Sequence, residues 1–240
     1  MKINSNHMMG FRIWISLLAL IPLLTLFSCL DNNDEGPVPD TAFVSIYHGS
    51  PNAPELDIYT ESRRITNSPL AYSQSFPYSQ FFAADRTLKF NPHNASNTLL
   101  ETEHTFEKDK IYTLFIVNEV ADLEVLQIED SWEDPDGDHA MVRLAHLSPD
   151  AGELEVLIND ESLPFGNSNP YLEVTEFLKM EKAKVKVTVK SKISGEKLVE
   201  VNEIDLRGNR VYTLMIRGFA DPSKGNNQLS VQLITNYIKF

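Results

Sequence analysis

The residues of this chain that most resemble metal ligands lie in one short acidic segment. Residues 130–139 read DSWEDPDGDH, in which Asp134, Asp136 and Asp138 alternate around a glycine. Calcium prefers several hard oxygen ligands at short spacing, and glycine permits the sharp turn between them. The distal glutamate of an EF-hand loop is missing, and acidic segments are also typical of solvated linkers. Two interpretations therefore stay open, a calcium site and a charged linker with no cofactor.

Two histidines, His48 and His146, recur at matching positions and carry the side chain of a ligand or an acid–base catalyst. Each follows alternating apolar residues and comes just before a Ser-Pro pair. No second titratable group accompanies either histidine in the sequence, as an acid–base site would require. We therefore expect each ring to hydrogen-bond to the backbone of the turn that follows it.

Aromatic residues crowd the stretch 71–82, among serines and glutamines. The candidates for ligand contacts are Tyr72, Tyr78, Phe81 and Phe82. Exposed together, such rings would form a platform for sugar stacking, although aromatic residues more often belong to a core. The equivalent stretch later in the chain is rich in lysine instead, which supports a binding role, and a place in the core remains the alternative.

Sequence patterns of known catalytic sites are missing from the chain. It has no nucleophile elbow, no phosphate-binding glycine loop, no H-E-x-x-H pair and no dinucleotide fingerprint. Cys29 is the single cysteine, so no disulfide or paired-cysteine metal site can form within one chain. We expect a protein that is not an enzyme, and the remaining catalytic route is a carboxylate pair assembled from distant loops.

The N-terminal 28 residues have the pattern of an export signal. Lys2 and Arg12 precede an apolar run over residues 13–27, which is shorter than the roughly 20 residues that a membrane-spanning helix needs. The run ends in Leu-Phe-Ser-Cys29, which resembles the lipobox of bacterial lipoproteins. That resemblance implies cleavage before Cys29, a diacylglyceryl thioether on its sulfur and a third acyl chain, such as palmitate, on the new amine. Several acyl chains anchor a protein stably. The alternative is an ordinary signal peptide with an incidental cysteine.

Residues 29–40 are rich in acidic residues, Asn, Pro and Gly, and predict a flexible tether. An acidic stretch after the lipidated cysteine resembles the surface-export signal of Bacteroidetes lipoproteins. It implies an outer-membrane protein exposed at the cell surface; a spacer facing the periplasm is the alternative. The net charge of −13 repels nucleic acid and anionic lipid, so we expect neither to bind by charge.

The chain contains an internal duplication. Residues 42–56 read AFVSIYHGSPNAPEL, and residues 140–154 read AMVRLAHLSPDAGEL. A second match follows, where Tyr112 and Tyr212 each begin a Tyr-Thr-Leu sequence. The repeat length of about a hundred residues is that of one immunoglobulin-like sandwich. The signature of the duplication consists of His48, Ser50, Pro51, His146, Ser148, Pro149, Tyr112 and Tyr212.

Apolar residues alternate with polar ones in short runs that Pro, Asn and Gly separate, which is typical of strands. The residues before Tyr212, and less clearly those before Tyr112, have the spacing of a tyrosine corner. We therefore predict an all-β protein, two tandem immunoglobulin-like antiparallel β-sandwiches after a lipoprotein signal peptide. The predicted segments are a signal peptide (1–28), a lipidated tether (29–40), a first sandwich (41–130), an acidic linker (131–139) and a second sandwich (140–240).

The H-x-S-P-[DN]-A signature with the later Tyr-Thr-Leu strand resembles the "domain of unknown function 4397" family, over about residues 42–130 and 140–236. The family occurs in tandem on secreted and lipid-anchored bacterial proteins, and the resemblance implies no catalytic residues. We expect a non-catalytic binding module, held at the membrane by its lipid, that contacts a glycan or another envelope protein. The alternatives are a structural subunit or stalk of a surface assembly, and a glycan-processing accessory enzyme.

Overall fold

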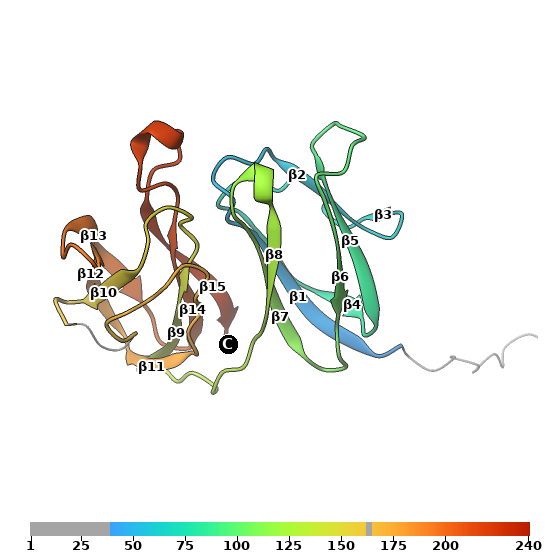
Figure 1. The fold of residues 1–240 in the computed structure, drawn as a ribbon. Coiled ribbons are helices and arrows are strands. Elements are labelled where there is room, and N and C mark those ends of the chain that lie inside the picture. The colour runs from blue at the N-terminus through green and yellow to red at the C-terminus, as the bar shows by residue number, and fades with distance from the viewer. Residues whose placement is uncertain (1–38, 162–164) are drawn as a thin grey trace, which may run out of the picture. The chain divides into compact units, whose positions relative to one another are not determined.

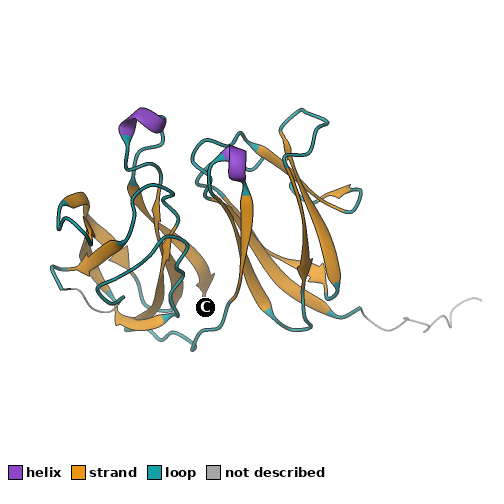
Figure 2. Cartoon of the chain, viewed as in Figure 1, coloured by secondary structure: helices purple, strands orange, loops and turns teal. Residues whose placement is uncertain are grey.

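The computed structural model describes residues 39–161 and 165–240, so the leader and Cys29 lie outside the described residues. Asp40–Phe240 forms one compact unit. Within the described residues, no helix has the length and hydropathy to cross a membrane. Strands dominate, joined by loops and by two short 3₁₀ helices, η2 (Val120–Asp122) and η3 (Pro222–Lys224) (Figure 2). The all-β prediction is confirmed.

The first copy, residues 41–130, folds as two facing sheets (Figure 1). Its strands are β1 (Thr41–His48), β2 (Leu56–Thr60), β3 (Arg63–Arg64), β4 (Ser75–Phe82), β5 (Asp85–Pro92), β6 (Leu100–Thr105), β7 (Ile111–Val117) and β8 (Glu124–Glu129). One sheet has the order β4-β1-β7-β8 and the other the order β3-β2-β5-β6. Val44, Ile46, Leu56 and Ile58 are fully buried between them.

The second copy, residues 140–240, repeats this plan, and its first strand begins one residue earlier. Its strands are β9 (His139–His146), β10 (Leu154–Ile158), β11 (Leu178–Glu181), β12 (Ala183–Ser191), β13 (Lys197–Leu206), β14 (Arg210–Arg217) and β15 (Ser230–Ile238). The sheets have the orders β11-β9-β14-β15 and β10-β12-β13. Each copy is antiparallel except for one pair, β1 with β7 and β9 with β14, which run parallel.

The central strands β1 and β9 are buried along most of their length on both faces. The inward faces of these strands fill the cores of their own copies, as the alternation indicates. Their other faces meet each other, because Tyr47, Phe115, Ala145 and Met215 form a third apolar cluster with members from both copies. Each of these four side chains is at most 2% exposed. The two copies therefore pack through equivalent sheets.

Candidate functional site

A buried ion pair lies at the contact between the two copies. Arg143 on β9 is 1% exposed, and its Nη1 donates a hydrogen bond to Oδ1 of Asp130 at 2.5 Å. Its Nε donates to Oγ1 of Thr213 at 3.0 Å, and its Nη2 donates to Oγ1 of Thr113 at 3.1 Å. The two threonines occupy matching positions in the two copies. One guanidinium thus joins both copies, and its full set of partners satisfies a charge that would otherwise be costly to bury.

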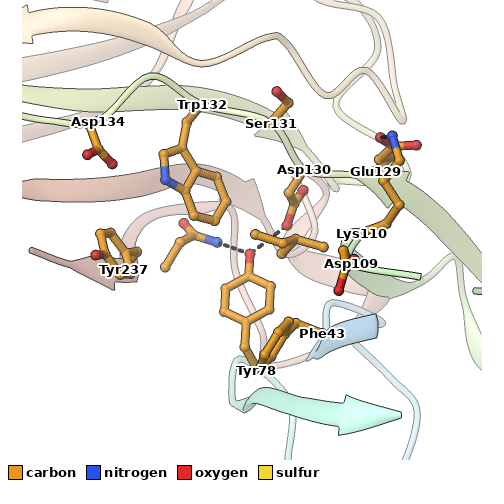
Figure 3. Close-up of a pocket in the computed structure, with 12 residues that line it drawn as sticks. Phe43, Tyr78, Asp109, Lys110, Glu129, Asp130, Ser131, Trp132, Asp134 and Tyr237 are labelled. Atoms are coloured by element: carbon orange, nitrogen blue, oxygen red, sulfur yellow. Dashed lines mark hydrogen bonds and ion pairs between the residues drawn. The ribbon is translucent and has the colours of Figure 1, made fainter. Parts of the chain in front are cut away.

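Next to this ion pair opens a cleft of about 590 Å³, at the point where the end of β8 passes into the acidic linker. We call it the Trp132 cleft. Aromatic side chains from distant segments border it (Figure 3). Phe43 is 40% exposed and Tyr237 is 41% exposed, whereas Trp132 is half-buried. The lining residues are Phe43, Tyr78, Asp109, Lys110, Ile111, Glu129, Asp130, Ser131, Trp132, Asp134, Asn236 and Tyr237.

Trp132 is packed between rings of both copies and still borders the cleft. Its ring lies 6.4 Å from that of Tyr78 in the first copy and 5.5 Å from that of Phe177 in the second, centroid to centroid. Tyr237 lies 6.0 Å away, with its plane tilted by 30° from that of the indole. These neighbours pack against the indole, so ordering it for a ligand costs little entropy.

Hydrogen bonds fix the polar groups at the base of this cleft. The hydroxyl of Tyr78 donates to Oδ2 of Asp130 at 2.5 Å and accepts from Nδ2 of Asn236 at 3.1 Å (Figure 3). Burial, and then the charge of Asp130, raise the pKa of Tyr78, which therefore stays protonated. At the rim, Lys110 pairs with Glu129. Asp130 pairs with Arg143 and Asp134 with Lys239, so three of the four lining carboxylates have a cationic partner and the cleft carries little net charge.

The four aromatic candidates of residues 71–82 do not form one platform. Phe81 lies in the core of the first copy, whereas Phe82 is 55% exposed on the opposite side of β4. Tyr78 points into the Trp132 cleft, and Tyr72 lies beneath the guanidinium of Arg217, 5.1 Å from its centre. These four residues therefore do not form a shared sugar-stacking surface.

Tyr72 has a counterpart in the second copy, which the sequence comparison missed. The Tyr72 ring meets that of His48 edge-on at 6.3 Å, and the Tyr171 ring meets that of His146 edge-on at 5.8 Å. The backbones agree as well, since Ser73 donates to the carbonyl of His48 and Leu172 to that of His146. Tyr72 thus belongs to the repeated structure.

The signature residues of the duplication stabilise turns through hydrogen bonds. Nε2 of His48 lies 3.0 Å from the carbonyl oxygen of Pro54, and Nε2 of His146 lies 2.8 Å from that of Gly152. Ser50 and Ser148 are fully buried in these turns, beside Pro51 and Pro149. The Tyr112 hydroxyl accepts a hydrogen bond from the backbone N–H of Glu107, and the Tyr212 hydroxyl accepts one from that of Arg207. Both copies therefore have the same tyrosine contact, although Lys108 stands in the first copy where Gly208 stands in the second.

The three linker aspartates each have a lysine partner. Asp134 pairs with Lys239 at 3.2 Å, Asp136 with Lys179 at 2.9 Å and Asp138 with Lys182 at 2.7 Å. Hydrogen bonds from His139 and then Lys179 lower the pKa of Asp136. In the part of the chain that the structure describes, no three His, Cys, Asp or Glu side chains gather as a metal site would require. The structure thus does not bring these carboxylates together, and two of the lysines come from the lysine-rich stretch.

Comparison with known proteins places the chain in a family. The model of the domain of unknown function DUF4397 matches residues 42–157 and 140–238. The chain belongs to this family. No curated protein matches the chain. Among solved structures it is similar to CBMbc (family CBM26) from Eubacterium rectale Amy13K, in complex with maltoheptaose, at 11% identity. That match covers 79% of this chain and 96% of the other, with a TM-score of 0.27, which is too low to relate their ligands.

Proposed function

We propose that this DUF4397 protein is a non-catalytic binding module of the bacterial envelope, and that the Trp132 cleft binds an uncharged sugar. The observation that carries the proposal is the lining of the cleft, where exposed aromatic rings stand beside fixed polar groups. Binding sites for small molecules commonly combine apolar and aromatic walls with a few well-placed polar groups. A sugar ring presents C–H groups to the aromatic faces and hydroxyls to the carboxylates.

The charge of the cleft favours a neutral ligand. Lys110, Arg143 and Lys239 are each paired with a carboxylate of the cleft, so none of them is free to bind an anionic sugar. The carboxylate oxygens of the lining accept hydrogen bonds from hydroxyl groups. The protonated hydroxyl of Tyr78 is already paired with Asp130, which holds the base of the cleft in place. The ligand class is therefore a neutral oligosaccharide.

The test is binding of the chain from residue 29 to an array of neutral oligosaccharides, followed by calorimetric titration of the best ligand. We expect Trp132→Ala and Tyr237→Ala each to weaken binding at least tenfold, because each removes an aromatic face. Phe82→Ala is the matched control, since Phe82 is an exposed aromatic residue outside this cleft. Failure of every neutral glycan to bind, or equal losses in all three variants, would refute the assignment.

We further propose that a lipid on Cys29 holds the module at the outer membrane, facing outward. Support comes from the apolar run, the lipobox-like Leu-Phe-Ser-Cys29 sequence and the acidic tether. We expect Cys29→Ser to move the protein from the membrane fraction to the soluble fraction. Protease added to intact cells should digest the wild-type protein. Retention of the serine variant in washed membranes would disprove the lipid anchor, and resistance to the protease would disprove the outward orientation.

A further inference from the structure

A second cleft, of about 610 Å³, lies in the first copy at the edge strand β4 and the β2–β3 turn. Its lining residues are Thr41, Thr60, Glu61, Arg63, Arg64, Ile65, Asn67, Phe76, Ser79, Gln80, Phe81, Phe82 and Arg86. Three arginines therefore surround an apolar wall that includes the exposed ring of Phe82. Residues 41–130 contain three arginines, and all of them line this cleft.

The positive charge of this arginine cleft is only partly compensated. Arg86 pairs with Glu61 at 2.6 Å, and Arg64 pairs with Asp57 at 2.5 Å. Arg63 is exposed and has no ion pair or side-chain hydrogen bond to any residue within 39–161 and 165–240. The chain as a whole carries 34 acidic and 21 basic residues, so a local excess of arginine runs against the composition.

The guanidinium groups of the arginine cleft determine which class of ligand it can bind. Their planar fork pairs with two oxygens of a carboxylate or a sulfate at once. The Arg86 guanidinium lies 5.4 Å from the ring centroid of Phe82, so cation and aromatic face already adjoin. Asn67, Ser79 and Gln80 add polar side chains that suit hydroxyl groups. The combination fits a sugar ring that carries an anionic substituent.

The acidity of the rest of the protein does not prevent such binding. At physiological ionic strength charges are screened over about 8 Å, so an anion inside the cleft responds mainly to the nearest arginines. The repulsion between the whole chain and a polyanion slows their approach but leaves these short contacts largely intact.

The second copy lacks the same combination. Phe82 pairs with Thr41 across the sheet, and Glu181 pairs in the same way with His139. Thr41 and His139 are equivalent, so a glutamate takes the place of the exposed phenylalanine. By the same register Lys179 stands where Gln80 stands in the first copy. The arginine cleft is thus a feature of one copy and not of the common fold.

We propose that the arginine cleft is a second binding site, which takes an acidic sugar through its carboxylate or sulfate groups. Arg63 and Arg86 contact the anionic group, and Phe82 packs against the ring. The site does not depend on the Trp132 cleft, whose nearby cations are already paired with carboxylates and which suits neutral sugars.

Calorimetric titration with oligogalacturonate, a sulfated galactan oligosaccharide and neutral cellohexaose tests the proposal. We expect at least one anionic probe to bind, and cellohexaose not to compete with it. The probe that binds distinguishes carboxylate from sulfate recognition. Arg63→Ala and Arg86→Gln should each weaken binding at least tenfold, and Arg63→Lys should weaken it as well because the fork is lost. Trp132→Ala should leave it unchanged, so the two clefts are tested separately.

Arg207→Ala is the matched control, since it removes one exposed arginine from the second copy, outside the cleft. We expect its affinity to remain within about twofold of the wild type. An equal loss in Arg207→Ala and Arg63→Ala would show that general charge attracts the probe, and would overturn the proposal. Failure of both anionic probes to bind, or unchanged binding in Arg63→Ala at an unchanged melting temperature, would overturn it too.

Discussion

At the scale of single residues, Arg143 has the largest predicted effect on stability. Arg143→Met leaves Asp130, which is 5% exposed, without its cationic partner. Breaking a buried pair from one side costs about 3–5 kcal/mol, because the remaining charge stays desolvated. We expect a loss of this size in the free energy of unfolding, measured by urea denaturation.

The exposed pair Arg207–Asp205 provides the control for Arg143. Arg207→Met should change stability little, since solvent screens such pairs. The double variant Arg143→Met/Asp130→Asn should recover part of the loss, because the uncompensated charge is gone. A loss in Arg143→Met no larger than in Arg207→Met would contradict the role given to this ion pair.

The histidines of the two turns predict how stability depends on pH. Burial lowers the pKa of His48 and of His146 below the ordinary value of 6.5. Below pH 6.5 the unfolded chain then binds more protons than the folded protein, so the free energy of unfolding falls as pH drops from 7 to 5. His146→Gln should be less stable at pH 7 and should show a smaller decrease toward pH 5, in urea titrations at both values. An identical decrease in the variant would exclude His146 as a source.

The role of a residue could be predicted where its partners lie close to it along the sequence. His48 contacts Pro54 and His146 contacts Gly152, each six positions away, so the turn is visible in the local pattern. Arg143 contacts Thr113 and Thr213, which lie 30 and 70 positions away. Trp132 likewise meets rings from both copies. Nothing in the local sequence indicates these partners.

At the scale of elements, the packing of the turn before β14 predicts that alanine substitutions at two glycines affect stability differently. A Cβ added at Gly208 would overlap the carbonyl oxygen of Gly137, whereas a Cβ added at Gly137 would meet no atom within 4 Å. We expect Gly208→Ala to destabilise the protein by about 1–3 kcal/mol, since backbone must shift to make room. Gly137→Ala should melt close to the wild type in thermal unfolding. Equal melting temperatures for the two variants would contradict this packing.

The alternation of apolar and polar residues in β1 and β9 predicted both strands correctly, but it explained the burial of only one face of each strand. Val44 and Ile46 face the core of their own copy, as expected. The opposite face carries mixed residues, such as Ser45, Tyr47 and Arg143, that resemble an exposed surface in sequence. They are buried because the other copy covers them. A pattern within one strand contains no information about a second sheet packed on its outer face.

At the scale of the whole molecule, the contact between equivalent sheets predicts cooperative unfolding. The cluster with Tyr47, Phe115 and Met215 and the network around Arg143 would both be exposed if one copy unfolded alone. We expect a single calorimetric transition in which the calorimetric and van't Hoff enthalpies agree. Arg143→Glu should separate it into two transitions, because it places two carboxylates together at the contact. Two independent transitions in the wild type would contradict the coupling.

The Trp132 cleft can be tested by a single measurement, because Trp132 is the only tryptophan after residue 28. The indole fluorescence of the chain from residue 29 therefore reports on this cleft alone. We predict a saturable change in intensity or wavelength on titration with a neutral oligosaccharide, and at least tenfold weaker binding in Tyr237→Ala. Unchanged fluorescence across a broad set of neutral glycans, or the same affinity in Tyr237→Ala, would contradict the sugar-binding assignment.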